Sequence, residues 1–201
     1  MTHALVLSCS PAGDTSISRR MLAQYLAQRA TMYRDETLTT RDFAAPENAL
    51  PHLSGIFTTA MFLPPDARTP EQSRELELSD RLVAEFQSAD TLVVATPMYN
   101  YTVPTTLKAW IDHVARPGLT FTYEGGVQRG LAHAQRAVFL VASGGIYTSG
   151  HQAPQDFLVP YLRHMMSFFG ITDVTFLRAE GLAWDAPSAI ARAEADIANA
   201  A

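Results

Sequence analysis

The chain has 201 residues, of which 47% are hydrophobic and 17% are charged, and its formal net charge is −5 at pH 7. This composition predicts one globular domain over residues 1–201 and argues against nucleic acid and anionic membranes as partners, because both need clustered Lys and Arg. We expect no membrane insertion and no secretory signal, since no apolar run approaches the ~18 residues of a spanning helix and the N-terminal run is short. The single cysteine, Cys9, excludes an internal disulfide and favours a cytoplasmic location.

Five short segments separated by helical patterns are predicted to be strands. They cover residues 4–7, 36–43, 92–97, 137–142 and 174–177. The second segment is the most polar, which is typical of a strand at the edge of a sheet. Strands that alternate with helices predict a three-layer α/β fold, with a five-stranded parallel sheet of order 2-1-3-4-5 and helices on both faces.

Helix signals stand between these segments. The clearest is at Thr69, which can cap a helix with Pro70 at its first position and with Gln72 completing a capping box. Pro160 should kink a helix over residues 157–169 or mark its beginning, and Gly170 should end it. Further helices are predicted from Ile17, over residues 55–61, from Pro104 and over residues 187–200, with a hairpin or extended loop over residues 120–126.

Two of these helical segments, over residues 104–114 and 157–169, carry more apolar area than one sheet face should need. Trp110, Met166 and Phe168 are the largest contributors, together with Met165. A large exposed apolar patch usually marks a protein contact. We therefore expect a second copy of the chain to cover this surface.

The loop after the first strand is rich in hydroxyl groups and leads into a helix. It contains Ser8, Ser10, Thr15, Ser16 and Ser18. A helix N-terminus carries a partial positive charge and free N–H groups, so hydroxyls placed there can bind a phosphate without a lysine. An ordinary helix cap in a polar turn would give the same pattern, and both interpretations remain open at this point.

Two more loops are predicted at the same edge of the sheet. Met98, Tyr99 and Asn100 follow the third strand and offer an aromatic ring, an amide and backbone N–H groups. Gly144-Gly145 follows the fourth strand and either lets the backbone approach a ligand or forms a simple turn. Because ligands of open α/β sheets bind beyond the carboxyl ends of the strands, the three loops predict a site for one mononucleotide, and FMN fits it.

Other phosphate-binding motifs are missing from the sequence. A P-loop needs Gly-x-x-x-x-Gly-Lys-Ser/Thr, and a dinucleotide fingerprint needs Gly-x-Gly-x-x-Gly, whereas the first loop contains only Gly13. A low-molecular-weight tyrosine phosphatase would have an arginine six residues after its cysteine, and Thr15 occupies that position after Cys9. Cys9 is therefore not expected to be a nucleophile.

Four segments resemble the FMN-dependent NADH-azoreductases of bacteria, which are relatives of the NAD(P)H quinone reductases with a flavodoxin-like fold. They are Ser10 with Ser16-Ile17-Ser18, Pro97-Met98-Tyr99-Asn100-Tyr101, Ala142-Ser143-Gly144-Gly145-Ile146 and Phe168-Phe169-Gly170-Ile171-Thr172. The resemblance covers nearly the whole chain. It implies a homodimer with FMN bound non-covalently near the subunit interface, and two-electron ping-pong hydride transfer from NADH or NADPH to quinones or azo compounds.

The matched motifs assign site residues in all three loops. The residues implied to bind the cofactor are Ser10, Ser16, Ile17, Ser18, Pro97, Met98, Tyr99, Asn100, Tyr101, Ala142, Ser143, Gly144 and Gly145. The apolar candidates for the substrate pocket are Phe57, Met61, Phe62 and Phe121. The family often has Ser-Arg where this chain has Ala142-Ser143, and some members have an arginine near Phe62, so this site is less basic.

Catalysis by hydride transfer requires no dedicated acid, because the cofactor carries the chemistry. Tyr99, Tyr147 and His151 are candidates to assist protonation, although each residue type is more often structural. No cluster of His, Cys and Glu has metal-ligand spacing, so we predict no metal. The alternatives are a flavodoxin-type electron carrier without its own nicotinamide oxidation, and a binding or regulatory module that has lost the flavin.

Overall fold

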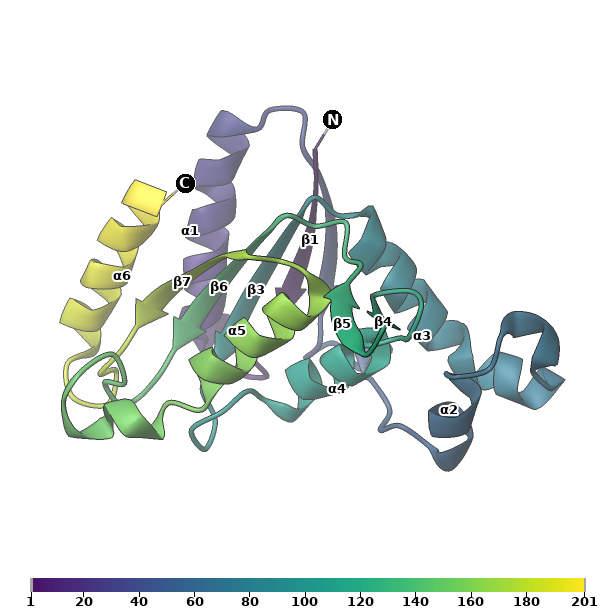
Figure 1. The fold of residues 1–201 in the computed structure, drawn as a ribbon. Coiled ribbons are helices and arrows are strands. Elements are labelled where there is room, and N and C mark those ends of the chain that lie inside the picture. The colour runs from purple at the N-terminus through teal and green to yellow at the C-terminus, as the bar shows by residue number, and fades with distance from the viewer. Residues whose placement is uncertain (1, 201) are drawn as a thin grey trace.

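The computed structural model describes residues 2–200 and shows a parallel sheet between two layers of helices (Figure 1). Neighbouring strands are parallel throughout, in the order β2-β1-β3-β6-β7. Their bounds are β1 (His3–Ser8), β2 (Thr37–Asp42), β3 (Thr91–Pro97), β6 (Arg136–Ala142) and β7 (Asp173–Ala179). The five predicted segments therefore form the five strands of the sheet, and β2 lies at its edge as predicted.

The predicted strand order 2-1-3-4-5 is corrected to 2-1-3-6-7. The reason is that residues 120–126, predicted as a hairpin or extended loop, begin a hairpin of two strands, which take the numbers 4 and 5. These strands, β4 (Phe121–Glu124) and β5 (Val127–Gly130), pair with each other as a separate antiparallel sheet. The hairpin lies beside α5 (Leu158–Phe169), and Gln128 donates a hydrogen bond of 2.5 Å to the Phe168 carbonyl.

Helices cover both faces of the sheet because its central strands are apolar on both faces. On one side, α1 (Ile17–Met32) and α6 (Ala186–Ala200) pack together over a cluster that includes Val6. On the other side, a larger cluster contains Leu5 and Leu7. The helices of that side are α3 (Pro70–Ser88), α4 (Thr105–Val114) and α5, which stands in front of the sheet in Figure 1.

The predicted helix boundaries follow from local chemistry. At the start of α3, the Gln72 N–H donates to Thr69 Oγ1 at 3.2 Å and the Thr69 N–H donates to Gln72 Oε1 at 2.9 Å, so the predicted capping box is confirmed. Pro160 lies in the first turn of α5, where its missing N–H has no intrahelical partner to lose. Gly170 ends α5 with a left-handed φ of 92°.

The apolar surface predicted over α4 and α5 is largely internal. Trp110 and Met166 are each 1% exposed, and the Trp110 ring meets the Phe86 ring edge-on with the centroids 5.4 Å apart. Met165 and Phe168 are partly buried against the same cluster. The apolar area of Trp110 and Met166 is therefore internal, while a contact between copies at the partly exposed Met165 and Phe168 stays a prediction.

The long irregular segment before α3 contains the predicted short helix, α2 (Gly55–Ala60), which packs against α3. Figure 1 shows α2 and the turn after it projecting from the side of the molecule opposite α6. Within residues 2–200, no helix has both the length and the apolar character needed to cross a membrane.

Candidate mononucleotide site

The loops after β1, β3 and β6 meet in one cavity of about 230 Å³ at the carboxyl edge of the sheet. A fourth loop, after β7, adds Leu182 to its wall. The lining residues are Ser10, Ala12, Thr15, Ser16, Ile17, Ser18, Pro97, Met98, Tyr99, Ala142, Ser143, Gly144 and Leu182. Ten of the thirteen predicted cofactor residues are in this set, while Asn100, Tyr101 and Gly145 stand directly beside it in the same loops.

The first loop brings hydroxyl groups to the N-terminus of α1. Ser16 is the N-cap, and its Oγ accepts a hydrogen bond from the Arg19 N–H at 3.3 Å and lies 3.1 Å from Ser18 Oγ. Ser10, Ser16 and Ser18 are all buried. Among the described residues, no acceptor is found for the N–H groups of Ile17 and Ser18. Free N–H groups next to buried hydroxyls at a helix N-terminus suit a phosphate.

Arg19 fixes this loop from behind. Its Nε and Nη2 donate to the Ser10 carbonyl at 3.2 and 3.0 Å, and its guanidinium forms a bidentate ion pair with Asp42 at the end of β2. The hydrogen bond from Arg19 holds the pKa of Asp42 below its ordinary value. The charge of Arg19 is therefore neutralised within the chain, and the phosphate-binding capacity of the loop comes from hydroxyls and N–H groups.

The second loop has a strained backbone. Tyr99 and Thr102 exchange two backbone hydrogen bonds of 3.0 Å, and both intervening residues have left-handed φ angles, 47° at Asn100 and 70° at Tyr101. Asparagine tolerates this region, but a tyrosine adopts it rarely, and such strain concentrates at functional sites. The turn leaves the residues Tyr99 and Tyr101 41% and 46% exposed.

The third loop is held by the loop after β7. The N–H groups of Gly181, Leu182 and Ala183 donate to the carbonyls of residues 145, 143 and 144, respectively. A Cβ on Gly145 would lie 2.8 Å from Gln152 Oε1 and 3.0 Å from the Tyr147 ring. A side chain at this position would therefore require the Gln152 and Tyr147 side chains of the same loop to shift.

Two lining residues were not predicted as site residues. Ala12 offers only a small side chain in the first loop, and no sequence signal marks it. Leu182 follows the last strand, and the position of β7 beside β6 could have indicated it, because neighbouring parallel strands end at the same edge. Thr15 belongs to the hydroxyl-rich loop, and its Oγ1 donates to the Ala12 carbonyl at 2.8 Å.

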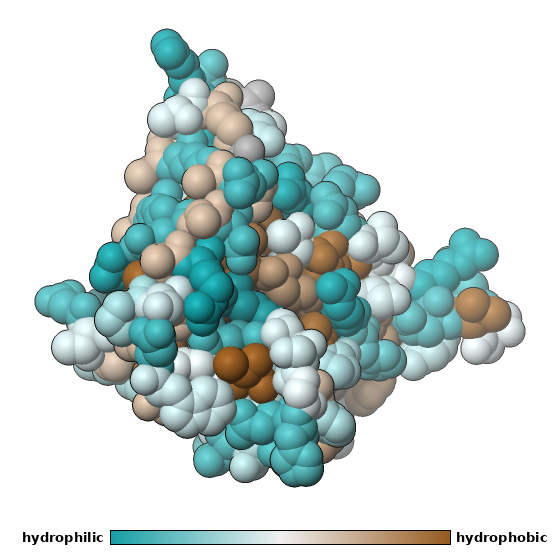
Figure 2. All heavy atoms as spheres, turned by 90° about the vertical axis from the view of Figure 1, so that its left-hand side faces the viewer, coloured by the Kyte–Doolittle hydropathy of each residue, from teal (hydrophilic) through white to brown (hydrophobic). Residues whose placement is uncertain are grey.

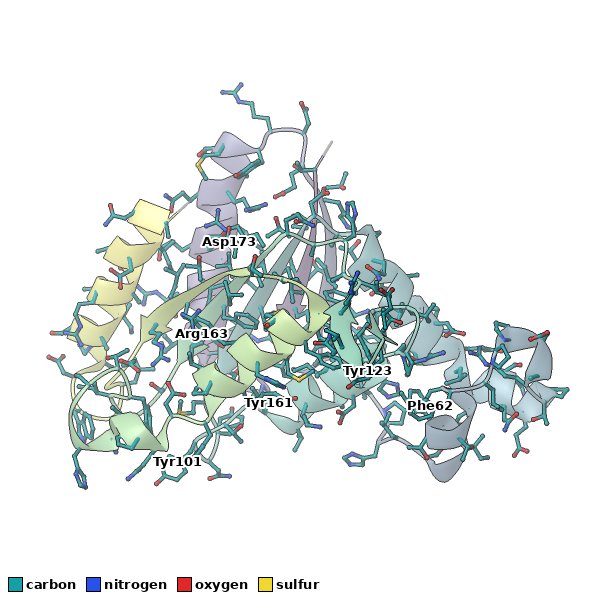
Figure 3. All side chains as sticks on the ribbon, in the orientation of Figure 1. Phe62, Tyr101, Tyr123, Tyr161, Arg163 and Asp173 are labelled. Carbon is teal, nitrogen blue, oxygen red and sulfur yellow. The ribbon has the colours of Figure 1, made fainter. Side chains whose placement is uncertain are left out.

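The candidates for the substrate pocket lie away from this cavity. Phe57 is 1% exposed, with its ring edge-on to His113 at 5.2 Å between centroids, and Phe121 is 8% exposed and packs on the Phe168 ring at 4.5 Å. Packing leaves both rings little exposed surface within one chain, and a substrate contact at Phe57 and Phe121 stays a prediction. Met61 and Phe62 line a separate groove with Arg68, Arg116 and Leu119. Figure 3 labels Phe62 beside α2 and Tyr101 at the lower left, below α5.

The polar candidates for proton transfer also differ in position. Tyr99 lines the cavity, the Tyr147 ring contacts the Tyr101 ring, and His151 is an exposed residue of the 3-10 helix Gly150–Gln155 in the third loop. Desolvation, and then the nearby Tyr101, Asp156 and Glu180, raise the pKa of Tyr147 above its ordinary value. Cys9 is buried at the end of β1, and burial raises the pKa of its thiol far above its ordinary value, so it is not a thiolate nucleophile. Among residues 2–200, no group of three or more His, Cys, Asp or Glu side chains could hold a metal ion.

This combination defines a class of protein. A three-layer parallel α/β fold with a hydroxyl-lined helix N-terminus and an aromatic turn at its carboxyl edge is a mononucleotide-binding protein of flavodoxin type. The residues present fit FMN, since the unpaired N–H groups of Ile17 and Ser18 suit its phosphate and the exposed rings of the second loop suit its flat ring system.

Comparisons with known proteins agree with this class. Residues 2–201 match the family described as Flavodoxin-like fold. A protein of Herminiimonas arsenicoxydans named FMN-dependent NADH:quinone oxidoreductase is 40% identical over 186 residues, which cover 92% of this chain and 90% of that protein. A protein of Jannaschia sp. (strain CCS1) named FMN-dependent NADH:quinone oxidoreductase 1 is 41% identical over 197 residues, with 98% and 97% covered.

The structural match is equally complete. The crystal structure of an FMN-dependent NADH-azoreductase from Bacillus anthracis, in complex with FMN, superposes with a TM-score of 0.89 at 25% identity, covering 100% of this chain and 97% of that one. The chain therefore belongs to the flavodoxin-like family, among the FMN-dependent NADH:quinone oxidoreductases and azoreductases. The resemblance seen in the sequence motifs is confirmed.

Proposed function

We propose that this protein is an FMN-dependent oxidoreductase that uses NADH, or NADPH, to reduce quinones and azo compounds. The observation that supports this most directly is the single cavity in which ten residues matched to the FMN motifs of the family come together. The relatives named FMN-dependent NADH:quinone oxidoreductase support the donor and the acceptor class. A cytoplasmic location, where NADH is available, fits this function.

The roles of the chain's own residues follow from the geometry. Ser10, Ser16 and Ser18, with the N–H groups at the start of α1, would hold the phosphate. Met98, Tyr99 and Gly144 would border the ring system. Bound FMN would supply the redox chemistry by taking a hydride from the nicotinamide and giving it to the acceptor. The protein's task is to orient the flat reactants, and no side chain at the cavity has the partners of a dedicated general acid.

We also propose a homodimer in which the second copy completes this site. A cavity of about 230 Å³ is smaller than the ~300–1,000 Å³ of most ligand sites, so the ring system would extend beyond its mouth. Exposed aromatic residues are available for such a contact, with Tyr123, Phe157 and Phe62 each more than 60% exposed. The face of α6 in Figure 2 is mostly hydrophilic with small, separate hydrophobic patches, which favours a contact elsewhere.

The function is tested by cofactor analysis followed by steady-state kinetics. Denaturation should release one FMN per chain, which mass spectrometry identifies. FAD or no flavin would contradict the proposal. If donor and acceptor use one pocket in turn, double-reciprocal plots at several fixed quinone concentrations should be parallel. Intersecting lines would contradict the shared pocket.

Two further outcomes separate the alternatives. Reduction of bound FMN only by a partner protein, with no response to NADH or NADPH, would favour a flavodoxin-type electron carrier. A colourless protein that does not bind added FMN would favour a binding or regulatory module. Light scattering at micromolar concentration tests the homodimer, and a monomer would contradict it.

A further inference from the structure

The third loop is long, and an ion cluster closes it. Between β6 and α5 the chain runs from residue 143 to residue 157 with only a 3-10 helix, η4 (Gly150–Gln155), inside. Glu180, just after β7, accepts hydrogen bonds from the Tyr147 N–H at 3.1 Å and from Thr148 Oγ1 at 2.6 Å. The carboxylate of Glu180 therefore holds the beginning of the segment 147–156.

The end of the same segment is held by Asp156. Its Oδ1 accepts hydrogen bonds from the N–H groups of Leu158 and Val159 at 3.0 and 2.9 Å. These N–H groups lie in the first turn of α5 and have no acceptor within the helix. The adjacent Phe157 N–H donates to the Tyr101 carbonyl at 3.1 Å. This junction therefore connects the third loop to the strained turn of the second loop.

Arg178, on β7, joins the two anchors. Its Nη1 donates to Glu180 Oε1 at 2.7 Å and its Nη2 donates to Asp156 Oδ2 at 2.7 Å. The three side chains are only 13%, 11% and 9% exposed, in the order Arg178, Glu180 and Asp156. One guanidinium thus holds two nearly buried carboxylates that come from opposite ends of the loop segment.

The clamped segment carries an aromatic contact at the flavin site. The Tyr147 ring meets the Tyr101 ring edge-on, with the centroids 6.2 Å apart, and Tyr101 lies two positions after Tyr99, which lines the cavity. Figure 3 shows Tyr101 at the edge of the molecule below the start of α5. Both tyrosines therefore depend on backbone positions that the ion cluster fixes.

We propose that Arg178 is a positioning residue that, through Glu180 and Asp156, holds Tyr147 and Tyr101 as the outer wall of the FMN site. This proposal rests on the proposed function for its ligand, but the clamp itself is a property of the chain. Removal of the guanidinium leaves two nearly buried carboxylates without the group that pairs with both, so the ends of the segment should separate. Lysine restores one charge but not the planar fork that donates to both carboxylates.

The test compares Arg178→Gln with Arg163→Gln. Arg163, labelled in Figure 3, lies on α5 with its guanidinium carbon 4.8 Å from the centroid of the Phe176 ring, and no hydrogen bond or ion pair is found for it within residues 2–200. Hydrogen–deuterium exchange should accelerate in peptides covering residues 99–102 and 144–157 in Arg178→Gln and stay unchanged in Arg163→Gln. Glu180→Gln, which keeps the size of the side chain, is the second variant if Arg178→Gln folds poorly.

Cofactor binding gives the functional measurement. The FMN dissociation constant, measured by quenching of flavin fluorescence, should rise roughly 5- to 20-fold in Arg178→Gln because a preorganised wall is lost, and by an intermediate factor in Arg178→Lys. The KM for quinone should rise with it, while kcat at saturating FMN should change less than about two-fold, because Arg178 takes no part in the reaction itself.

Three results would overturn the proposal. They are unchanged exchange in Arg178→Gln, faster exchange with unchanged FMN affinity, and equal effects of Arg178→Gln and Arg163→Gln. A wild-type protein that binds no FMN would instead overturn the proposed function. In that case the exchange pattern of the Arg178→Gln variant would still decide whether the clamp exists.

Discussion

The two ends of the candidate site are built in different ways. The phosphate end is formed by adjacent residues in the sequence, since residues 10–19 supply the hydroxyls, the helix N-terminus and the arginine that anchors the loop. Among the described residues, none that lines the cavity comes from α2 or from the hairpin β4–β5, where Phe57 and Phe121 are candidates for the substrate pocket. The local motif is therefore complete within one chain, whereas the cover of the ring end belongs to the homodimer that we propose.

The phosphate end gives the largest expected effect. Ser16→Asp should weaken FMN binding by roughly 100-fold or more, because like charges in close contact cost several kcal/mol. Aspartate is as good an N-cap as serine, so α1 should keep its stability. Titration with FMN followed by fluorescence measures the change.

A matched control separates charge at the site from charge at any helix cap. Thr69→Asp places the same carboxylate at the N-cap of α3, which is exposed and does not line the cavity. FMN affinity should be unchanged in this variant. Wild-type affinity in Ser16→Asp would show that the phosphate binds elsewhere.

The attachment of the hairpin is the next test. A Cβ on Gly130 would lie 2.0 Å from the carbonyl carbon of Phe169 and 2.1 Å from the Gly170 nitrogen, both backbone atoms at the end of α5. Gly130→Ala should therefore destabilise the protein by about 3 kcal/mol, since the hairpin must move away from α5. Urea unfolding measures this loss.

Gly55→Ala is the control in the other covering element. No atom lies within 4 Å of a Cβ at Gly55, the first residue of α2, and its φ is not in the left-handed region. Alanine should be neutral there or stabilise the protein by ~0.5 kcal/mol through the unfolded chain. Equal stability of the two variants would contradict the close contact between the hairpin and α5.

A smaller effect is expected from the ion pair behind the phosphate end. Arg19 lowers the pKa of Asp42 in the folded state, so the stabilisation is fully present above the unfolded pKa of ~3.9 and is lost as the pH falls through the lower folded value. Both side chains are partly exposed, which limits the effect to about 1 kcal/mol or less.

This pH dependence is measured by urea unfolding of wild type and Asp42→Asn between pH 7 and 3. In the variant, the free energy of unfolding should lose the part of its pH dependence that Asp42 contributes. The FMN affinity of the variant should fall, because Arg19 then positions Ser10 less firmly. Asp112→Asn, which breaks the exposed pair with Lys108, is the control and should change the profile little. An identical profile for wild type and Asp42→Asn would contradict the assignment.

The smallest effect concerns proton transfer. His151→Gln should change kcat less than about two-fold at every pH, because His151 is exposed and does not line the cavity. Tyr99→Phe, at the cavity, keeps the ring and should also retain most of the activity. A general acid typically raises the rate by ~10²-fold or more. A loss of kcat of that size in either variant would identify that residue as a general acid and contradict the interpretation that the site has none.

Much of the molecule was determined by local sequence. The apolar runs specify the central strands because both faces of a parallel sheet are buried, and Thr69, Pro70 and Gly170 specify helix ends through hydrogen bonds with near neighbours. The hydroxyl-rich loop before α1 is also specified by local sequence, since its hydroxyl groups, from Ser10 to Ser18, lie within ten residues of one another.

Only the tertiary structure decided the exposure of residues that look alike in the sequence. Phe57 and Phe62 stand in one apolar segment, yet packing of α2 on α3 buries the first and leaves the second 69% exposed. Trp110 and Met166 are internal because α4 and α5 pack against the same core as α3. Leu182 reaches the cavity from the loop after the last strand, and Arg178 and Glu180 pair there with Asp156 of the loop after β6. Such contacts between residues distant in the sequence depend on which strands lie side by side.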